Sequence, residues 1–290
     1  MARTLEVDSK KHVPMQPDTL AQKKAALTRR LHELPGLLVA YSGGVDSAYL
    51  AWSAAKALGD RMLAVIADSA SLPRRHLIAA QEFAEKHGIP YKAMFTAELD
   101  NPDYVKNDSL RCFHCKSELF AVMERMRTQL GFSFLAYGLN LDDRQDFRPG
   151  QQAAQNRGVL APLVEVGLHK SEIRALARED GLEVWDKPAA ACLSSRIAYG
   201  QPVTTNTLNR IEKAEEFLES QGCREFRVRA HGDLARVEIA RSEMAHFLRD
   251  PGFLQRLSEA LKACGFMYVT LDCDGFRSGS MNAALTQANT

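Results

Sequence analysis

The six residues from Ser42 to Ser47, Ser-Gly-Gly-Val-Asp-Ser, have the composition of a loop that binds phosphate. Paired glycines let the main chain approach an anion closely, and free N–H groups at the start of a following helix stabilise its charge. The hydroxyl groups of Ser42 and Ser47 add donors, whereas the Gly-Lys-Ser/Thr ending of P-loop NTPases is missing. We therefore expect a phosphate site of another type; the alternative is a tight strand-to-helix turn with a serine cap.

Three of the six cysteines have the surroundings of reactive or metal-binding thiols. Cys112 and Cys115 form a Cys-x-x-Cys pair, a spacing at which two thiolates can bind one metal ion or close a redox disulfide. Cys192 lies beside hydroxyl groups and an arginine in Ala-Cys-Leu-Ser-Ser-Arg, and a cationic neighbour favours the thiolate. Three thiolates at one site suit a [4Fe–4S] cluster with one exchangeable position. Structural zinc is the alternative, but it needs a fourth ligand and usually a second pair.

The other three cysteines show fewer signs of chemistry. Cys264 ends an apolar helix and Cys223 follows a helix stop, so we expect both to pack in the interior. Cys273 lies in an expected turn, and nothing in the sequence gives it a role.

A pair of arginines, Arg227 and Arg229, lies on one face of an expected strand because side chains alternate along a strand. Two adjacent guanidinium groups repel each other unless they share an anion, and arginine suits bidentate contact with phosphate. The alternative is a solvated strand edge whose arginines pair with acids such as Glu238.

The elements that position these motifs follow from the hydrophobic pattern, which predicts alternating strands and helices up to about residue 200. Strands are expected at 37–41, 62–67, 91–95 and 132–137, and helices at 46–58, 71–88 and 115–130. This order is typical of an α/β fold with a doubly wound parallel sheet, whose ligands bind outside the carboxyl ends of the strands.

Several polar residues are expected at that end of the sheet. Ser69 follows the second strand and Gly138 the fourth, while Asp142 and Asp143 could help to hold Mg²⁺ or simply cap a turn. The stretch 142–158 is polar and rich in turn residues, as in a mobile active-site segment.

The last third of the chain changes character and predicts a small α+β domain. A helix is expected at 204–221, two alternating strands at 225–229 and 234–240, a helical stretch at 242–264 that Pro251-Gly252 interrupts, and a strand at 267–272. We therefore divide the chain into a flexible tail (1–17), an α/β domain (18–200) and an α+β domain (201–290).

The string SGGVDS resembles the loop signature of the ATP pyrophosphatases, and the order of further motifs resembles the LarE family from about residue 18 to 282. Those motifs are RCFHCK, ACLSSR, RVR before a glycine turn, RVE and LDCDGFRSGSMN. The resemblance implies ATP and Mg²⁺ as cofactors, with Asp46 as a catalytic residue. It places Ser42, Gly43, Gly44, Asp46 and Ser47 at the phosphates, and Ser69 and Gly138 at the adenosine.

LarE enzymes are ATP-dependent sulfur transferases that adenylate a carboxylate of pyridinium-3,5-biscarboxylic acid mononucleotide and convert it to a thiocarboxylate for the nickel-pincer cofactor of lactate racemase. In one class a cysteine at the position of Cys192 donates its own sulfur, and in the other three cysteines hold a [4Fe–4S] cluster. Cys112, Cys115 and Cys192 match the cluster class, because the sacrificial class has Trp at position 112. Whether Cys192 acts as a ligand or as a sacrificed donor stays open.

The resemblance also implies how the substrate is bound. Arg227 and Arg229 match the residues that bind its phosphate, Glu238 matches a polar substrate-site residue, and Ser195, Arg196 and Lys116 are weaker candidates. The C-terminal domain would bind the mononucleotide and mediate homo-oligomerisation, with a hexamer implied by the family. A partner protein of nickel-pincer biosynthesis is also expected.

Composition bears on the alternatives. In 290 residues the net charge is +1, which gives no long-range field for nucleic acid or an anionic membrane and argues against the rival hypothesis of a tRNA-thiolating enzyme. A synthetase that uses ammonia would leave the three cysteines unexplained, and a nucleotide-binding regulator with zinc is the non-enzymatic alternative. The sequence contains no apolar run of about 20 residues and no secretory signal, so a cytoplasmic enzyme is expected.

Overall fold

The computed structural model describes residues 19–145, 149–188, 191–277 and 279–282, and the predicted tail lies outside these ranges. Its larger sheet has four parallel strands in the order β3-β2-β1-β4. These strands are β1 Leu37–Ala40, β2 Met62–Asp68, β3 Tyr91–Phe95 and β4 Phe134–Tyr137. All of β1 is buried: Leu37 and Val39 belong to one hydrophobic cluster, and Leu38 and Ala40 to another. A strand between two layers must be apolar on both faces, so the expected α/β fold is confirmed.

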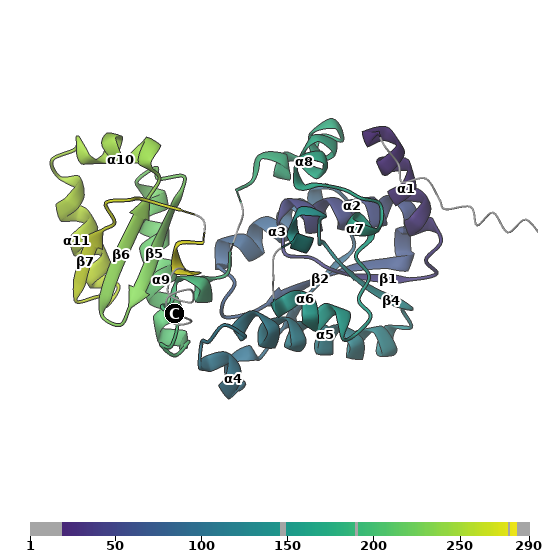
Figure 1. Ribbon diagram of the computed structural model, residues 1–290, viewed down its shortest axis with the longest axis horizontal. Helices are drawn as coiled ribbons and strands as arrows, with labels where there is room; N and C mark the ends of the chain where they lie inside the picture. The colour runs from purple at the N-terminus through teal and green to yellow at the C-terminus, as the bar shows by residue number, and fades with distance from the viewer. Residues whose placement is uncertain (1–18, 146–148, 189–190, 278, 283–290) are drawn as a thin grey trace, which may run out of the picture.

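Helices form a layer on each face of this sheet (Figure 1). The core cluster of Leu37 and Val39 joins the sheet to α1 Leu20–His32, α2 Val45–Leu58, α3 Arg74–Lys86, α7 Pro162–Glu165 and α8 Lys170–Glu179. The cluster of Leu38 and Ala40 joins it to α5 Arg111–Leu130 and α6 Pro149–Gln155. The short helix α4 Pro102–Val105 precedes α5.

Two helices on the second layer differ from expectation. Helix α5 begins at Arg111 rather than at Cys115, so both cysteines of the Cys-x-x-Cys pair lie at its start. The stretch 142–158, expected to be turns, contains α6, because Ala153 and Ala154 are buried in the same core cluster as α5. A short apolar pair is too weak a periodic signal to predict a helix in a polar segment.

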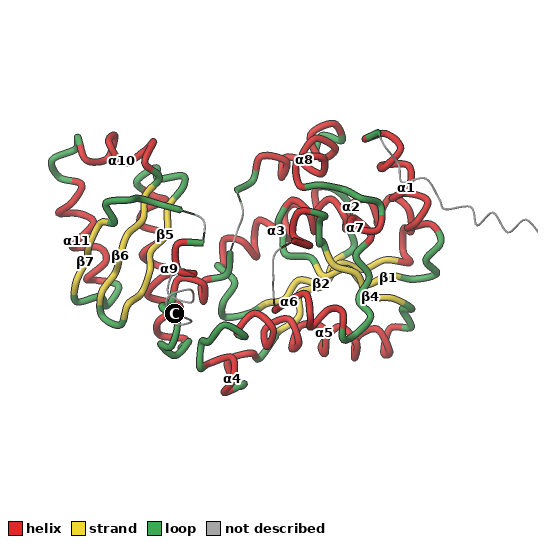
Figure 2. Tube along the Cα trace, viewed as in Figure 1, coloured by secondary structure: helices red, strands yellow, loops and turns green. Residues whose placement is uncertain are grey.

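The second sheet is confirmed as part of a smaller α+β unit and has the strand order β5-β6-β7 (Figure 2). Strands β5 Phe226–His231 and β6 Leu234–Ile239 are antiparallel, and β7 Tyr268–Leu271 is parallel to β6. One face of the sheet shares its core with α9 Thr205–Ser220 and α11 Phe253–Ala263, and α10 Arg241–Leu248 precedes α11. The register places Arg227 opposite Glu238 and Arg229 opposite Arg236, so these four side chains share the other face.

The segment after Cys192 joins the two units. Leu193 and Ile197 belong to the hydrophobic core of the second sheet, and Ile197 forms a bridge with Ala230 of β5. Tyr104 of α4 contributes to the same core. The turn that carries Cys192 is therefore packed against the C-terminal core as well as against the larger unit.

Short 3₁₀ turns connect the elements. They are η1 Gly59–Arg61, η2 Glu98–Asp100, η3 Asp142–Gln145, η4 Glu183–Asp186, η5 Leu193–Arg196 and η6 Ser280–Asn282.

No helix in the ranges that the structure covers is long and apolar enough to cross a membrane.

Candidate active site

The predicted phosphate loop connects β1 to α2, and Gly44 is the N-cap of the helix. Its two serines brace each other: the Ser47 Oγ accepts from the Ser42 N–H at 3.1 Å and lies 3.0 Å from the Ser42 Oγ. The N-cap residue Gly44 has no side chain to cap the helix. The free N–H groups of the first turn are therefore the donors that such a loop offers to an anion.

Two glycines allow close approaches around this loop. Gly43 has φ +70°, and a Cβ there would lie 2.8 Å from the Cβ of Ala80. A Cβ at Gly138, just after β4, would lie 2.6 Å from the Ser47 nitrogen. The structure thus brings Gly138 and the phosphate loop together at the carboxyl ends of β1 and β4, as a doubly wound sheet predicts.

Asp46 has an incomplete set of partners. Its Oδ2 accepts from Lys170 Nζ at 2.6 Å and from Asn140 Nδ2 at 3.3 Å, whereas its buried Oδ1 has no partner among the described residues. Asn140 also donates to Asp143 Oδ2 at 2.8 Å. These oxygens are of the type that Mg²⁺ prefers, and the unpartnered carboxylate oxygen of Asp46 fits the role of a Mg²⁺ ligand. Sequence reasoning missed Lys170, which lies 124 residues from Asp46.

Asp142 has the capping role that the sequence left open. Its Oδ2 accepts from the Lys170 N–H at 2.7 Å at the start of α8, and its Oδ1 lies 2.5 Å from His169 Nδ1. The hydrogen bond with His169 and then that with the Lys170 N–H lower the pKa of Asp142.

Ser69 is buried at the end of β2, where its hydroxyl is engaged within the protein. It donates to Glu98 and accepts from the Ser71 N–H at 2.9 Å. Thr96 Oγ1 also donates to Glu98, at 2.8 Å. Contact between Ser69 and adenosine therefore stays a prediction.

The three predicted sulfur residues share one electrostatic neighbourhood. The pKa of Cys115 is raised to about 12, mainly by burial. The negative charge of a Cys192 thiolate raises this pKa further. Desolvation and Cys192 likewise raise the pKa of Cys112, although that residue is exposed as a whole. Arg111 and Lys116 oppose the shift at Cys112. The side chain of Lys116, a weak substrate candidate, thus lies beside the cysteine pair.

Within the described ranges, no three His, Cys, Asp or Glu side chains are gathered closely enough to hold a single metal ion. A cluster differs from a single ion because its cysteines bind different iron atoms. Three thiols whose charges affect one another, with two neighbouring cations, have the donor chemistry that an anionic iron–sulfur cluster needs.

The turn after Cys192 is fixed to the loop of Ser71 and to helix α4. The Leu193 N–H donates to the Ser71 carbonyl oxygen at 2.8 Å. The hydroxyl groups of Ser71, Tyr104 and Ser194 form a closed, fully buried ring with distances of 2.5, 2.6 and 2.8 Å. No sequence pattern pointed to Tyr104, whose partners lie far away along the chain.

Arg196 positions this turn from the other side. Its Nε and Nη2 donate to the two carboxylate oxygens of Glu215 on α9 at 3.0 and 3.1 Å. Its Nη1 donates to the Cys192 carbonyl oxygen at 2.9 Å and to Ser195 Oγ at 3.0 Å. Arg196 is 1% exposed, so its donors are committed to holding the turn.

The arginine face of the second sheet adjoins the same turn. Arg229 donates from Nε and Nη2 to Glu238 Oε2 at 2.9 and 2.8 Å, and from Nη1 to the Ser195 carbonyl oxygen at 3.2 Å. Arg236 donates to Glu238 Oε1 at 3.1 Å, and its buried Nε lacks a partner within the described residues. Glu238 is fully buried, so it is not the solvated acid of the alternative reading.

Arg227 lies on that face and also lines a cleft of about 300 Å³. Its guanidinium carbon lies 4.9 Å from the centre of the Phe276 ring. Burial, and then the charge of Arg196, lower the pKa of Arg227 to about 10. Other cations line the cleft with it, among them Arg75, Lys187 and Arg224.

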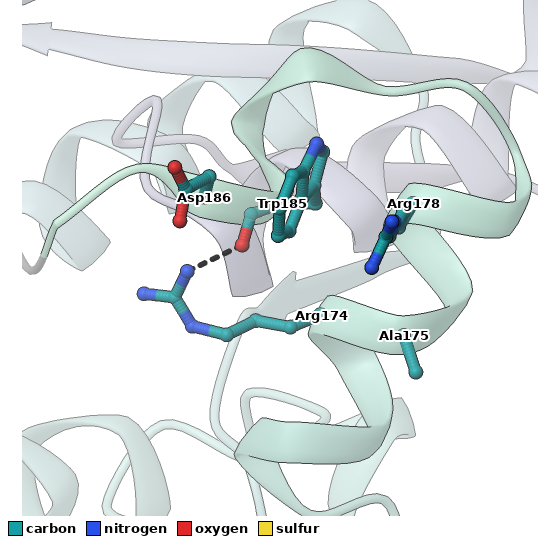
Figure 3. A pocket seen from close by; sticks show the side chains of 5 residues that line it. All are labelled: Arg174, Ala175, Arg178, Trp185 and Asp186. Carbon is teal, nitrogen blue, oxygen red and sulfur yellow. Dashed lines mark hydrogen bonds between the residues drawn. The ribbon is translucent and has the colours of Figure 1, made fainter.

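A second hollow, of about 440 Å³, lies beside α8, and Arg174, Trp185 and Asp186 are among the residues that line it (Figure 3). Arg174 donates to the Trp185 carbonyl oxygen and, at 2.7 Å, to that of Lys187. Arg178 lies 4.9 Å from the centre of the Trp185 ring, whose partial burial against the core agrees with a packing role.

The remaining cysteines lie apart from these groups. Cys223 is buried and Cys264 half-buried in the C-terminal core, as their sequence context predicts, whereas Cys273 is exposed.

Comparison with known proteins identifies relatives over nearly the whole chain, although no family model matches it. An uncharacterised protein of Synechocystis is 40% identical over 92% of this chain and 100% of its own length. The pyridinium-3,5-bisthiocarboxylic acid mononucleotide synthase of Lactiplantibacillus plantarum is 35% identical over 93% of this chain and 97% of its own. An uncharacterised protein of Methanocaldococcus jannaschii is 24% identical over 83% and 91%. The chain therefore belongs to the LarE family, as the order of its motifs predicts.

Proposed function

We propose that this enzyme is an ATP-dependent sulfur transferase that converts a carboxylate of pyridinium-3,5-biscarboxylic acid mononucleotide into a thiocarboxylate. The name of the Lactiplantibacillus relative, a pyridinium-3,5-bisthiocarboxylic acid mononucleotide synthase, supports the product. The observation that carries the proposal is the position of the turn 192–196. It is bonded to the helix of the Cys-x-x-Cys pair through Arg111 and to the arginine-bearing strand through Arg229.

ATP is needed because a carboxylate is a poor electrophile. An oxygen of the carboxylate attacks the α-phosphorus, the bond to the β-phosphate breaks, and pyrophosphate leaves with the bonding electrons. The resulting acyl adenylate can expel AMP. The loop of Ser42–Ser47 would bind the phosphates, and Asp46 with Asn140 and Asp143 would hold Mg²⁺, which neutralises phosphate charge.

The arginine face would bind the phosphate of the mononucleotide. Arg227 and Arg229 share this face with the buried Glu238, which fixes Arg229 through two hydrogen bonds. Because Arg229 also contacts the Ser195 carbonyl oxygen, a substrate held there would lie beside the Cys192 turn. Positioning of this kind is a large part of catalysis for two reactants.

Cys112, Cys115 and Cys192 would hold a [4Fe–4S] cluster, which supplies a sulfide as the nucleophile when it is bound. The protein contributes three thiols in one electrostatic environment, the cations Arg111 and Lys116, and a turn whose main chain is fixed on two sides. Metal binding requires the thiolate form, so the cluster would have to overcome the raised pKa of Cys115.

The proposal is tested by anaerobic reconstitution of the protein with iron and sulfide, followed by addition of ATP, Mg²⁺, sulfide and the biscarboxylate mononucleotide. We expect AMP, pyrophosphate and a product heavier by the difference between sulfur and oxygen for each converted carboxylate. AMP formation without any gain in product mass contradicts sulfur transfer to this substrate. Stoichiometric zinc without a brown chromophore after anaerobic purification contradicts the cluster.

A further inference from the structure

The ammonium group of Lys187 lies at the phosphate loop without an anionic partner. Its Nζ donates to the Gly43 carbonyl oxygen at 3.0 Å, and a Cβ at Gly43 would be 3.8 Å from it. No carboxylate within the described ranges forms an ion pair with Lys187, and burial alone lowers its pKa. A half-buried cation that touches only a neutral carbonyl is poorly compensated, and a bound anion would compensate it.

The main chain at Lys187 is held in place by other residues. Arg174 donates to the carbonyl oxygens of Trp185 and Lys187, and the Lys187 N–H donates to the Val184 carbonyl oxygen at 3.1 Å. Figure 3 shows Arg174 reaching from α8 to this segment. These hydrogen bonds therefore hold the main chain at Lys187 in a fixed position beside the phosphate loop.

The cleft beside Lys187 is strongly electropositive. Arg75, Arg224 and Arg227 line it with Lys187, while Glu219 is its one acidic residue in the described ranges and pairs with Arg75. Burial and the nearby charges of Arg75 and Lys187 lower the pKa of His76, another lining residue, to about 4. Such a cleft attracts a small, multiply charged anion.

We propose that Lys187 binds the pyrophosphate half of ATP, and that the cleft of Arg75 and Arg224 receives pyrophosphate as it leaves. This assignment rests on the proposed adenylation. When the bond between the α-phosphorus and its bridging oxygen breaks, the electron pair goes to that oxygen, and the negative charge of the leaving pyrophosphate grows. An ammonium group at Gly43 stabilises that charge more than it stabilises bound ATP, which is the requirement for catalysis.

The experiment is calorimetric titration of the ligand-free protein with inorganic pyrophosphate in the presence of Mg²⁺, with AMP titrated separately. Lys187→Met should weaken pyrophosphate binding by about tenfold to a hundredfold, the value of a hydrogen bond to a charged group, and leave AMP binding unchanged. Lys187→Arg should restore most of the loss. Lys92→Met, at an exposed position of strand β3, is the matched control and should bind both ligands like the wild type.

Pyrophosphate binding by Lys187→Met at the wild-type affinity overturns the proposal. An equal loss of pyrophosphate and AMP together with a lower melting temperature also overturns it, because that pattern indicates a structural lysine. The titration needs no carboxylate substrate, so it is separable from the proposed function. Wild-type protein that binds neither Mg–ATP nor pyrophosphate contradicts the adenylation itself.

Discussion

Arg111 Nη1 donates to the Ser194 carbonyl oxygen at 3.0 Å and thereby joins the helix of Cys112 and Cys115 to the turn that follows Cys192. Arg111 is 5% exposed as a whole residue, and its guanidinium also donates to Asn107 and lies 5.5 Å from the centre of the Tyr199 ring. Arg111 is thus a positioning residue between two segments about 80 residues apart in the sequence. If three cysteines hold one cluster, this contact sets their relative placement.

Replacing Arg111 should therefore impair cluster binding more than nucleotide binding. Arg111→Met removes a buried charged hydrogen bond, so we expect it to lower the free energy of unfolding by about 1–3 kcal/mol. Iron and acid-labile sulfide per chain after anaerobic reconstitution should fall to a small fraction of the wild-type content. ATP affinity should not change.

The matched control is Arg125→Met, an exposed position on the same helix. It should retain the full iron content. Full iron content in Arg111→Met would show that the contact does not set the cysteine geometry.

Removing the charge of Asp46 should weaken nucleotide binding in a metal-dependent way. Asp46→Asn keeps the size of the side chain but weakens the proposed Mg²⁺ ligand, so affinity for ATP with Mg²⁺ should fall roughly tenfold or more. Affinity for ATP in EDTA should change little. Asp60→Asn in the exposed turn η1 is the control, and equal losses with and without Mg²⁺ would argue against a metal role.

The hydrogen-bonded ring of the Ser71, Tyr104 and Ser194 hydroxyl groups should contribute measurably to the free energy of unfolding. Tyr104→Phe deletes a buried hydroxyl that makes two short hydrogen bonds, so urea denaturation should show a loss of about 1–2 kcal/mol. Tyr91→Phe removes an exposed hydroxyl bonded to Glu85 and should leave the midpoint unchanged. Equal midpoints for the two variants would mean that the ring contributes nothing.

The raised pKa of Cys115 predicts slow alkylation of the metal-free protein. With a pKa of about 12, the thiol stays protonated between about pH 8 and 10, and only the thiolate reacts with iodoacetamide. Peptide mass analysis at pH 8 should find the exposed Cys273 modified long before Cys115, and the rate at Cys115 should still rise above pH 10. Equal rates at pH 8 would contradict the burial of this thiol.

The fold could be predicted where side chains repeat with a clear period. The strand at Leu37–Ala40 is apolar because both faces are buried, and Arg227 and Arg229 share a face because strand side chains alternate. The start of α5 could not be predicted, because its N-cap residue Leu110 offers no capping side chain and the contacts of Arg111 are tertiary.

The site was predictable only in its local motifs. The Ser42–Ser47 loop and the Cys-x-x-Cys pair can each be recognised from a few consecutive residues. Lys170, in contrast, contacts Asp46 from 124 residues away, and Lys187 contacts Gly43 from 144 residues away. Arg196 shows the converse: it follows Cys192 closely in sequence, yet its donors are directed to Glu215 and to main-chain oxygens. Spacing reveals which residues are available but not which partner the fold gives them.

The role of Cys192 in sulfur transfer is the central claim, and a comparison of two products of Cys192→Ala tests it most directly. Pyrophosphate release from ATP in the presence of the mononucleotide and the sulfur content of the product are measured in the same anaerobic reaction. We predict that pyrophosphate is still released at close to the wild-type rate in the first turnover, because adenylation does not use Cys192, and that no thiocarboxylate appears. Thiocarboxylate formation by the variant, or loss of both products, would contradict the account.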